Sequence, residues 1–286
     1  MGGPPFGTLY LVAVPIGNLG DLTRRSLGVL SSVSVVASED VPATRRLLSS
    51  QGIHSRVVSY REAGREAAGR EILQVLRGGD SVALVCEAGT PGISDPGRDL
   101  VARCHEEGIP VSPLPGASAL TAALSASGLP ARRFAFEGFL PRSPSERRRF
   151  LEGLAREPRT LVFFEAPHRL VQALQDLRQA LGDRRAFLGR EMTKRFEECR
   201  AGRLGEILER FLAEEPRGEC VLVVEGASDT GPAVEEETLT GDAVFLRGLG
   251  LGAGDAAEVL AHFRGVRRNL AWRLVARVGD GQESQA

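Results

Sequence analysis

SVALVCEAGTPGISDPG, residues 81–97, joins a short apolar run to a loop rich in glycine and proline. The run SVALVC (81–86) has the length of a buried β-strand, and the loop EAGTPGISDPG (87–97) contains three glycines and two prolines. Glycines and prolines at this density give a rigid loop whose main chain a ligand can approach closely. In open α/β sheets, ligands bind where loops leave the carboxyl ends of strands. The stretch therefore predicts an α/β sheet with a ligand site at the end of one strand.

The same pattern recurs on either side of this stretch. Apolar strand signals occupy 7–15, 32–38 and 109–114, and a segment with helical spacing follows each of them. Two more loops of turn-forming residues, PIGNLGD (15–21) and LPGASA (114–119), follow the first and the last of these strands. Glycine and proline could merely mark a turn in one loop, but three such loops in one sheet favour a shared ligand site. The alternation of strands and helices predicts a parallel sheet covered on both faces.

A second α/β rhythm begins after residue 133. Its strand signals are FAFEGF, RTLVFFE, RRAFLGRE and GECVLVVEG, separated by amphipathic helical segments. The stretch ASDTGPAVEEETLTGD is acidic and rich in turn formers, which is typical of a linker, and only helical patterns follow it. We therefore expect an α/β fold with two α/β domains, 1–130 and 131–226, a linker at 227–241 and a small basic helical module at 242–286.

The composition excludes several classes of protein. The 286 residues are 42% hydrophobic with a formal net charge of −1, so the chain lacks the overall positive charge typical of nucleic-acid-binding proteins. The four cysteines form no C-x-x-C pair and no cluster with histidine at metal-binding spacing, so we expect no metal site. No apolar run approaches the length of a membrane span, and the first residues do not resemble a signal peptide, so we expect a cytoplasmic protein.

One basic position differs from all the others. Lys194, in REMTKRFEE (190–198), is the only lysine among 36 lysines and arginines. Arginine can replace lysine on a solvated surface, but not where a compact cation or an amine able to lose its proton is required. Lys194 is therefore a candidate functional residue, although survival of a single lysine by chance explains the sequence as well.

The glycine-rich loops do not carry a known phosphate-binding motif. The chain contains no G-x-x-x-x-G-K-[ST], and G-x-G-x-x-G is missing from the turn after the first strand. A nucleoside-like cofactor held by backbone amides and carboxylates remains open.

Eight ordered segments resemble those of one bacterial family. They are VAVPIGNLGDLTRRS, SED, EAGTPGISDPG, LPGASALTAALSASGLP, FEGFLPRS, FFEAPHR, REMTKRFEE and GECVLVVEG, and they span roughly residues 7–226. In this order they resemble the ribosomal RNA small subunit methyltransferases I, a branch of the tetrapyrrole methylase superfamily. Eight blocks in one order make the resemblance specific.

The resemblance implies a cofactor and a place for it. Members of this family bind S-adenosylmethionine in the cleft between two α/β domains, largely through backbone groups. In the first domain, the matching positions of this chain are Pro15, Gly17, Glu87, Gly89, Thr90, Pro91, Ile93, Ser94, Gly116, Ala117 and Ser118. In the second domain they are Phe164, Glu165, Ala166 and Met192.

The resemblance also implies a reaction. Members of the family transfer the methyl group to the ribose 2′-hydroxyl of a cytidine in small-subunit (16S) ribosomal RNA, and they act as homodimers. The expected partners are therefore this RNA, or the assembled small ribosomal subunit, and a second copy of the chain.

Three residues are candidates for a direct part in catalysis: Lys194, Glu191 and Asp40. A 2′-hydroxyl is a weak nucleophile that a base or a nearby cation would activate. Lys194, beside Glu191, is expected to hold the ribose or its phosphate, or to act as the base. The alternative is an ion pair without a catalytic part, between Lys194 and Glu191, Glu197 or Glu198. Asp40 ends a strand at the mouth of the expected cleft.

A basic segment near the C-terminus fits an RNA substrate. Residues 259–279 contain no acidic residue, and their arginines are Arg264, Arg267, Arg268, Arg273 and Arg277. Arginines along a helix can follow RNA phosphates, and Trp272 could stack on a base or pack in the core of the module. A charged helix face is often only solvated, but the missing acids favour contact with RNA.

The chain departs from the family pattern at two places. Residues 39–42 read EDVP where the family usually has EDTR, so a motif arginine is missing that Arg45 or Arg46 could replace. Cys86 and Glu87 stand where the family usually has Ser-Asp, which keeps the carboxylate but lengthens its side chain by one methylene. Two alternatives stay open: a small-molecule tetrapyrrole methylase, which the arginine-rich tail argues against, and an RNA-binding ribosome assembly factor without catalytic activity.

Overall fold

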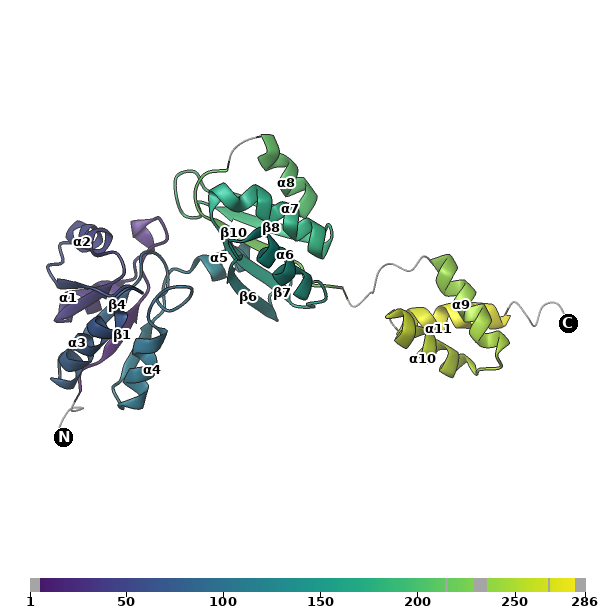
Figure 1. The fold of residues 1–286 in the computed structure, drawn as a ribbon, viewed down its shortest axis with the longest axis horizontal. Helices are drawn as coiled ribbons and strands as arrows, with labels where there is room; N and C mark the ends of the chain where they lie inside the picture. The colour runs from purple at the N-terminus through teal and green to yellow at the C-terminus, as the bar shows by residue number, and fades with distance from the viewer. Residues whose placement is uncertain (1–5, 214–215, 229–235, 267, 281–286) are drawn as a thin grey trace.

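The first sheet has five strands, four of which the sequence pattern predicts. The computed structural model describes residues 6–213, 216–228, 236–266 and 268–280. The strands of this sheet are β1 (Leu9–Val12), β2 (Val35–Ser38), β3 (Arg56–Ser59), β4 (Val82–Val85) and β5 (Val111–Leu114). They pair in the order β3-β2-β4-β1-β5, and each of these pairings is parallel. β4 thus lies at the centre of the sheet (Figure 1), and the loop 87–97 follows the carboxyl end of β4.

Helices cover both faces of this sheet because both faces of its strands are apolar. The helices are α1 (Arg24–Ser32), α2 (Val41–Ser50), α3 (Arg65–Arg77) and α4 (Arg98–Glu106). Leu84 of β4 packs in one core cluster with Leu73 of α3, whereas Ala83 packs in another with Leu30 of α1. Successive side chains of a strand point to opposite faces, so a continuous apolar run indicates burial on both sides. The prediction of a parallel sheet covered on both faces is confirmed.

The second sheet is mixed rather than parallel. Its strands are β6 (Phe134–Phe139), β7 (Thr160–Glu165), β8 (Arg185–Arg190), β9 (Glu198–Arg203) and β10 (Cys220–Val224), in the order β6-β7-β10-β8-β9. β6 and β7 are parallel, but β10 runs antiparallel to both of its neighbours. The register aligns Cys220, the first residue of β10, with Glu165 and Arg190, the last residues of β7 and β8. The beginning of β10 therefore joins the strand ends where a ligand site is expected.

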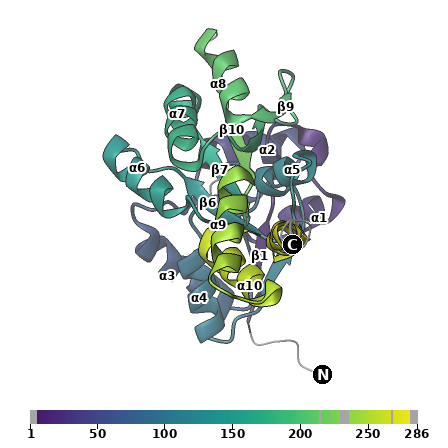
Figure 2. The same cartoon turned by 90° about the vertical axis from the view of Figure 1, so that its right-hand side faces the viewer.

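The helices of the second domain also lie on both faces of their sheet. α6 (Pro144–Gly153), α7 (Leu170–Leu181) and α8 (Leu204–Ala213) share a core with one face, and α5 (Ala119–Ala126) packs on the other. Figure 2 shows α5 on the opposite side of the strands from α6 and α7. Ile16, from the loop after β1, belongs to the same core cluster as Leu124 of α5. α5 precedes the expected domain boundary at residue 130 but packs on the second sheet, so it helps to join the two domains.

The sequence pattern does not predict two of the strands, β3 and β9. Both lie at the edge of a sheet. β9 reads ECRAGR, and most of its side chains are exposed. A polar edge strand lacks the apolar alternation by which strands are recognised, so only its pairing with β8 defines it.

Three helices form the module near the C-terminus: α9 (Glu236–Gly248), α10 (Ala253–Arg264) and α11 (Arg268–Asp280). Their core combines Leu239, Leu260 and Leu274 with small alanines, which let short helices approach closely. α9 begins inside the stretch 227–241 that the composition assigns to the linker, and residues 229–235 of that stretch lie outside the described residues.

Within the described part of the chain, no helix has the length and apolar character needed to cross a membrane.

Candidate functional site

A cavity of about 350 Å³ lies between the two α/β domains, at the ends of their strands. The first domain contributes the loops after β1, β4 and β5, and the second contributes the ends of β6 and β7 and the beginning of β10. This volume is typical of small-molecule sites, which often lie between domains. Nine of the predicted cofactor residues line the cavity: Glu87, Gly89, Thr90, Ile93, Ser94, Ser118, Phe164, Glu165 and Ala166.

Hydrogen bonds hold the three loops of the first domain together. Val14 and Gly89 exchange two backbone hydrogen bonds of 2.9 and 3.0 Å, and the Thr90 hydroxyl donates to the Ala117 carbonyl at 3.1 Å. Gly89 has φ +79° and Ser94 has φ +63°, in the left-handed region that most side chains disfavour. A backbone fixed in this way can present amide and carbonyl groups to a ligand with little further loss of entropy.

The other six predicted cofactor residues lie outside the lining: Pro15, Gly17, Pro91, Gly116, Ala117 and Met192. Some of them support its walls. A Cβ at Gly116 would lie 2.7 Å from the Ala13 Cβ, so the glycine allows two loops to touch. Met192 is buried in the core cluster that also contains Ile16 and Val221, both of which line the cavity.

Half of the lining is not predicted from the sequence: Ile16, Ala88, Asp95, Ala119, Phe139, Pro167, Glu219, Cys220 and Val221. Most of these residues adjoin a predicted one in the same loop, so the loop motifs already indicate them. Glu219, Cys220 and Val221 are different, because they begin a strand rather than follow one. Only the antiparallel direction of β10 brings them to the cavity.

The charged side chains in this lining are all carboxylates: Glu87, Asp95, Glu165 and Glu219. No lysine, arginine or histidine of the described residues lines the cavity. Because like charges repel at short range, such a lining disfavours a phosphate group and favours a ligand that carries positive charge.

Asp95 has an unusual protonation equilibrium. Burial raises the pKa of Asp95 to about 6; a hydrogen bond with Cys86 opposes this shift, and the charges of Glu39 and Glu87 add to it. Asp95 and Ser94 also line a second cavity, of about 450 Å³, together with Glu39 and Tyr60. A carboxyl group with this pKa changes charge near neutral pH, where a bound cation would favour its ionised form.

Glu165 offers a hydrogen-bond acceptor in the wall of the cavity. Its Oε1 accepts a hydrogen bond from the Ala166 amide at 2.8 Å and lies 3.3 Å from Nε of Arg169. Its Oε2 is buried and has no hydrogen-bond partner among the described residues. Burial raises the pKa of Glu165, while the Ala166 amide and the charge of Arg169 act against that shift. An unpaired acceptor of this kind is a place for a donor group of a ligand.

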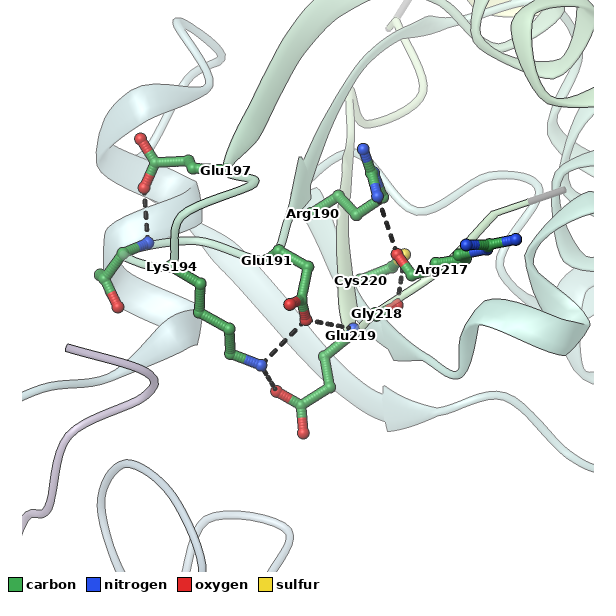
Figure 3. A network of polar contacts seen from close by, with 9 residues as sticks. Arg190, Glu191, Lys194, Glu197, Arg217, Gly218, Glu219 and Cys220 are labelled. Atoms are coloured by element: carbon green, nitrogen blue, oxygen red, sulfur yellow. Dashed lines mark hydrogen bonds and ion pairs between the residues drawn. The ribbon is translucent and has the colours of Figure 1, made fainter. Parts of the chain in front are cut away.

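Lys194 lies in the turn after β8, at the junction of the two domains. Its ammonium donates hydrogen bonds to Oε1 of Glu191 at 2.9 Å and to Oε2 of Glu219 at 3.1 Å (Figure 3). Glu219 lines the cavity, so the ammonium lies next to the cavity wall. The aliphatic part of Lys194 lies against Gly17 of the first domain, where an added Cβ would overlap it. Lys194 therefore bridges the two domains beside the cavity.

The ion pairs of Lys194 affect the role that it can have. Glu191 pairs with it as the sequence suggests, whereas Glu197 and Glu198 bond to other groups, and the second partner is Glu219. Burial opposes the charge on Lys194, but the hydrogen bonds and charges of Glu191 and Glu219 outweigh it and raise the pKa of the ammonium. A side chain that stays protonated at neutral pH is suited to hold a phosphate or ribose oxygen rather than to remove a proton.

Asp40 is placed differently from the other two catalytic candidates. Its carboxylate accepts a hydrogen bond from the Ala43 amide at 2.8 Å and caps the beginning of α2. It lies outside the lining of the cavity, whereas its neighbour Glu39 lines the second cavity. Arg45 and Arg46, the candidates to replace the missing motif arginine, are exposed on α2. The structure thus gives Asp40 a capping contact and does not bring it to the Lys194 cluster.

Arginines of the helical module form ion pairs with acidic residues that lie outside the acid-free segment 259–279. Three of them pair with acids of neighbouring helices: Arg264 with Asp242 at 2.6 Å, Arg268 with Glu258 at 3.5 Å and Arg277 with Glu236 at 3.2 Å. Arg273 has no ion pair within the described residues, and Arg267 lies outside them. Trp272 is 53% exposed and is not part of the buried core of the module, which leaves its ring accessible. The module surface is therefore less positive than its acid-free segment suggests.

Comparison with known proteins gives the family. The family model described as Tetrapyrrole (Corrin/Porphyrin) Methylases matches residues 8–208. A protein of Synechocystis sp. named Ribosomal RNA small subunit methyltransferase I is 43% identical over 94% of this chain and 97% of its own length. One of the same name from Pseudomonas aeruginosa is 44% identical over 93% and 96%. The chain belongs to the ribosomal RNA small subunit methyltransferase I family, within the tetrapyrrole methylases.

Solved structures agree with the fold of this family. A uroporphyrin-III C-methyltransferase from Thermus thermophilus is 25% identical, with a TM-score of 0.52 over 77% of this chain and 92% of that one. A cobalt precorrin-4 methyltransferase is 16% identical, with a TM-score of 0.58 over 76% and 94%, which shows a shared fold. As a member of the ribosomal RNA small subunit methyltransferase I family, the chain is a methyltransferase, and the cavity between its domains is the candidate active site.

Proposed function

We propose that the chain is an S-adenosylmethionine-dependent methyltransferase that methylates the ribose 2′-hydroxyl of a cytidine in small-subunit (16S) ribosomal RNA. It works in the cytoplasm as a homodimer, on the free RNA or on the assembled small subunit. The observation that carries this proposal is the cavity between the domains, with its acidic lining and with Lys194 beside its wall. The substrate is supported by relatives 42 to 50% identical that bear the name Ribosomal RNA small subunit methyltransferase I. The cytidine 2′-hydroxyl is the acceptor that the sequence resemblance implies.

The residues of the cavity suit S-adenosylmethionine in charge and in shape. The cofactor carries a sulfonium and an ammonium group, and four carboxylates supply the opposite charge. Ile16, Ile93 and Phe164 provide apolar surface for its adenine ring, and the fixed main chain at Gly89 provides hydrogen-bonding groups. The unpaired Oε2 of Glu165 is ready to accept a hydrogen bond from it.

The work of the protein is to align two reactants. S-adenosylmethionine supplies a methyl group that its positive sulfur has already activated. Alignment of an acceptor with such a donor can supply roughly 7 to 11 kcal/mol of the barrier. Lys194, kept protonated by Glu191 and Glu219, would hold the substrate phosphate or the ribose oxygen as it becomes negative. Glu219 belongs both to the cavity wall and to this ion pair, so it connects the donor site with the acceptor site.

Two alternatives have less support. The solved structures compared above methylate tetrapyrroles according to their names, but they are 25% identical or less, against 42 to 50% for the ribosomal RNA relatives. An assembly factor without catalysis would have no need of a cofactor cavity. The change at Cys86 and Glu87 keeps a carboxylate in the cavity lining, so it does not favour that alternative.

Transfer of labelled methyl groups tests the proposal. The purified protein with labelled S-adenosylmethionine should label small ribosomal subunits or their RNA, and it should not label uroporphyrinogen III. Mapping of 2′-O-methylated positions in RNA from cells with and without the gene should identify one cytidine. Label on the tetrapyrrole would support the first alternative, and a calorimetric titration without heat of cofactor binding would support the second.

The affinity for S-adenosylmethionine should depend on pH through Asp95. The pKa of its carboxyl group, about 6, is above the ordinary value for aspartate. The protonated carboxyl group therefore contributes to the stability of the folded protein at low pH, and this contribution is lost as the pH rises through about 6. A bound cation favours the ionised form, so affinity should increase by about fivefold to tenfold between pH 5 and pH 7. Calorimetry at several pH values should show this increase for the wild type and for the exposed control Glu152→Gln. Asp95→Asn should flatten the profile, and an unaltered profile in that variant would contradict the role of Asp95.

A further inference from the structure

Six arginines gather at the end of the second sheet that lies opposite the cofactor cavity. They line a third cavity, of about 1180 Å³, and form what we call the arginine cluster: Arg132, Arg133, Arg156, Arg184, Arg185 and Arg203. They come from the residues just before β6, the loop after α6, the beginning of β8 and the end of β9. The carboxylates in this lining are Asp183 and Glu225, so the cluster carries a clear excess of positive charge.

Several of these guanidinium groups are available to a ligand. Arg132 and Arg156 are exposed and have no hydrogen bond or ion pair with any described residue. Arg185 is 59% exposed and lies 3.8 Å from Glu225, which is the outer limit of an ion pair. Exposed cations without close partners keep their full charge for an incoming anion.

Two other residues that line this cavity, Arg184 and Asp183, are hydrogen-bonded to backbone groups of the protein. Arg184 donates to the carbonyls of Leu181 and Ala155 at 2.8 and 2.5 Å, and burial lowers the pKa of its guanidinium. Asp183 accepts the Gly205 amide at 2.7 Å, so its carboxylate is already engaged at the beginning of α8. Among the described residues, the Asp183 carboxylate forms no ion pair with an arginine of the cluster.

We propose that the arginine cluster binds the phosphate backbone of RNA. Phosphates dominate RNA affinity, and arginine is the side chain best suited to hold them. Phe263 of the helical module lines the same cavity and is 79% exposed, so it offers a ring on which an unpaired base could stack. A second copy of the chain would bring the same positive charge, which disfavours self-association through this surface. That the RNA is ribosomal rests on the proposed function.

The position of the cluster says what kind of RNA it fits. β7 runs from Thr160 in the arginine-lined cavity to Glu165 in the cofactor cavity, a distance of about 17 Å for six residues of strand. A single nucleotide cannot reach both places, whereas a folded RNA can. Contacts so far from the reacting atoms position the substrate without touching the transition state. Their loss should therefore raise KM for RNA and leave kcat unchanged.

The test compares two triple variants of the full-length protein. One removes three exposed members of the cluster, Arg132→Gln, Arg133→Gln and Arg156→Gln. The matched control removes the same charge from scattered exposed positions outside it, Arg56→Gln, Arg70→Gln and Arg148→Gln. Binding of 16S ribosomal RNA is measured at several salt concentrations, together with cofactor affinity and steady-state methylation of the RNA. Unchanged cofactor affinity shows that each variant is folded, and the single change Arg156→Glu gives a second measure with one substitution.

The salt dependence separates the possible results. Each phosphate contact adds about 0.7 to 0.9 to the slope of log affinity against log salt, so the cluster variant should lose about 2 to 3 units of slope. Its KM for RNA should rise by about tenfold, and the control should stay near wild type. A cluster variant with the slope and KM of the control would overturn the proposal while the proposed function stands. If the wild type binds no ribosomal RNA, the proposed function and the RNA-binding role of the arginine cluster are both wrong. If the cluster variant labels RNA with the KM of the wild type, only the RNA-binding role of the cluster is wrong.

Discussion

Lys194→Met is expected to lower kcat for methyl transfer to RNA by about 100-fold, because loss of one group that stabilises transition-state charge costs 10²–10³ in turnover. Methionine keeps the apolar stem that lies against Gly17 but removes the ammonium that Glu191 and Glu219 hold. Because Lys194 lies outside the lining of the cofactor cavity, S-adenosylmethionine affinity should stay within about threefold. Single-turnover kinetics and calorimetry measure the two quantities separately.

The same turn supplies a control for the loss of charge. Arg195→Met removes one cation, but this guanidinium lies over the exposed ring of Phe196 and should leave kcat within about twofold. Lys194→Arg should lower kcat strongly as well, because a planar guanidinium cannot take the place of a compact ammonium between two carboxylates and a glycine. If Lys194→Met turns over like the wild type, the residue is a structural ion pair and the lone lysine has survived by chance.

The first sheet could be predicted because its strands have one simple signal. β4 is apolar at every position and buried on both faces, and a loop of glycine and proline ends it abruptly. β3 and β9 lack that signal because they are edge strands: most side chains of β9 are exposed, and β3 has only two partly buried valines between an exposed arginine and an exposed serine. Hydrogen bonds to a neighbouring strand define them, and the linear sequence does not contain those bonds.

The sequence predicts the residues of the site that follow parallel strands, but not those that precede an antiparallel strand. Loops that follow parallel strands converge, so Gly89, Thr90 and Ser118 could be placed together from the sequence. Glu219 could not, because it precedes its strand, and only the antiparallel register of β10 brings it beside the end of β7. The same limit affects the helical module, where acids on α9 and α10 pair with arginines of a segment that has no acid of its own.

The ligand itself was not contained in the local patterns. The glycine-rich loops indicate close approach of a ligand, and the missing motifs exclude two kinds of phosphate site, but S-adenosylmethionine came from the resemblance. The acidic lining that favours a cationic cofactor forms only when Glu87, Asp95 and Glu165 are brought together by two domains. Charge in a cavity is thus a property of the fold rather than of any one motif.

Gly17→Ala is expected to weaken S-adenosylmethionine binding by about 10- to 100-fold, because an overlap in a packed contact costs about 1 to 3 kcal/mol. Gly17 has φ +153°, a conformation that side chains rarely adopt, and its added Cβ would overlap the stem of Lys194. The overlap is relieved when the loop 15–21 moves away from the second domain. That movement widens the cavity between the domains, and calorimetric titration of the cofactor measures the loss.

Two further variants separate the overlap from the strain. Gly52→Ala is the backbone control, because Gly52 has φ +67° with open space around it and lies outside the cavity lining; it should lose stability but keep cofactor affinity. Gly17→Ala combined with Lys194→Ala keeps the backbone strain and removes the overlap, so it should regain most of the lost affinity. Equal weakness of the single and double variants would assign the effect to the backbone. Wild-type affinity in Gly17→Ala would mean that the contact between Gly17 and Lys194 does not hold the domains in their binding arrangement.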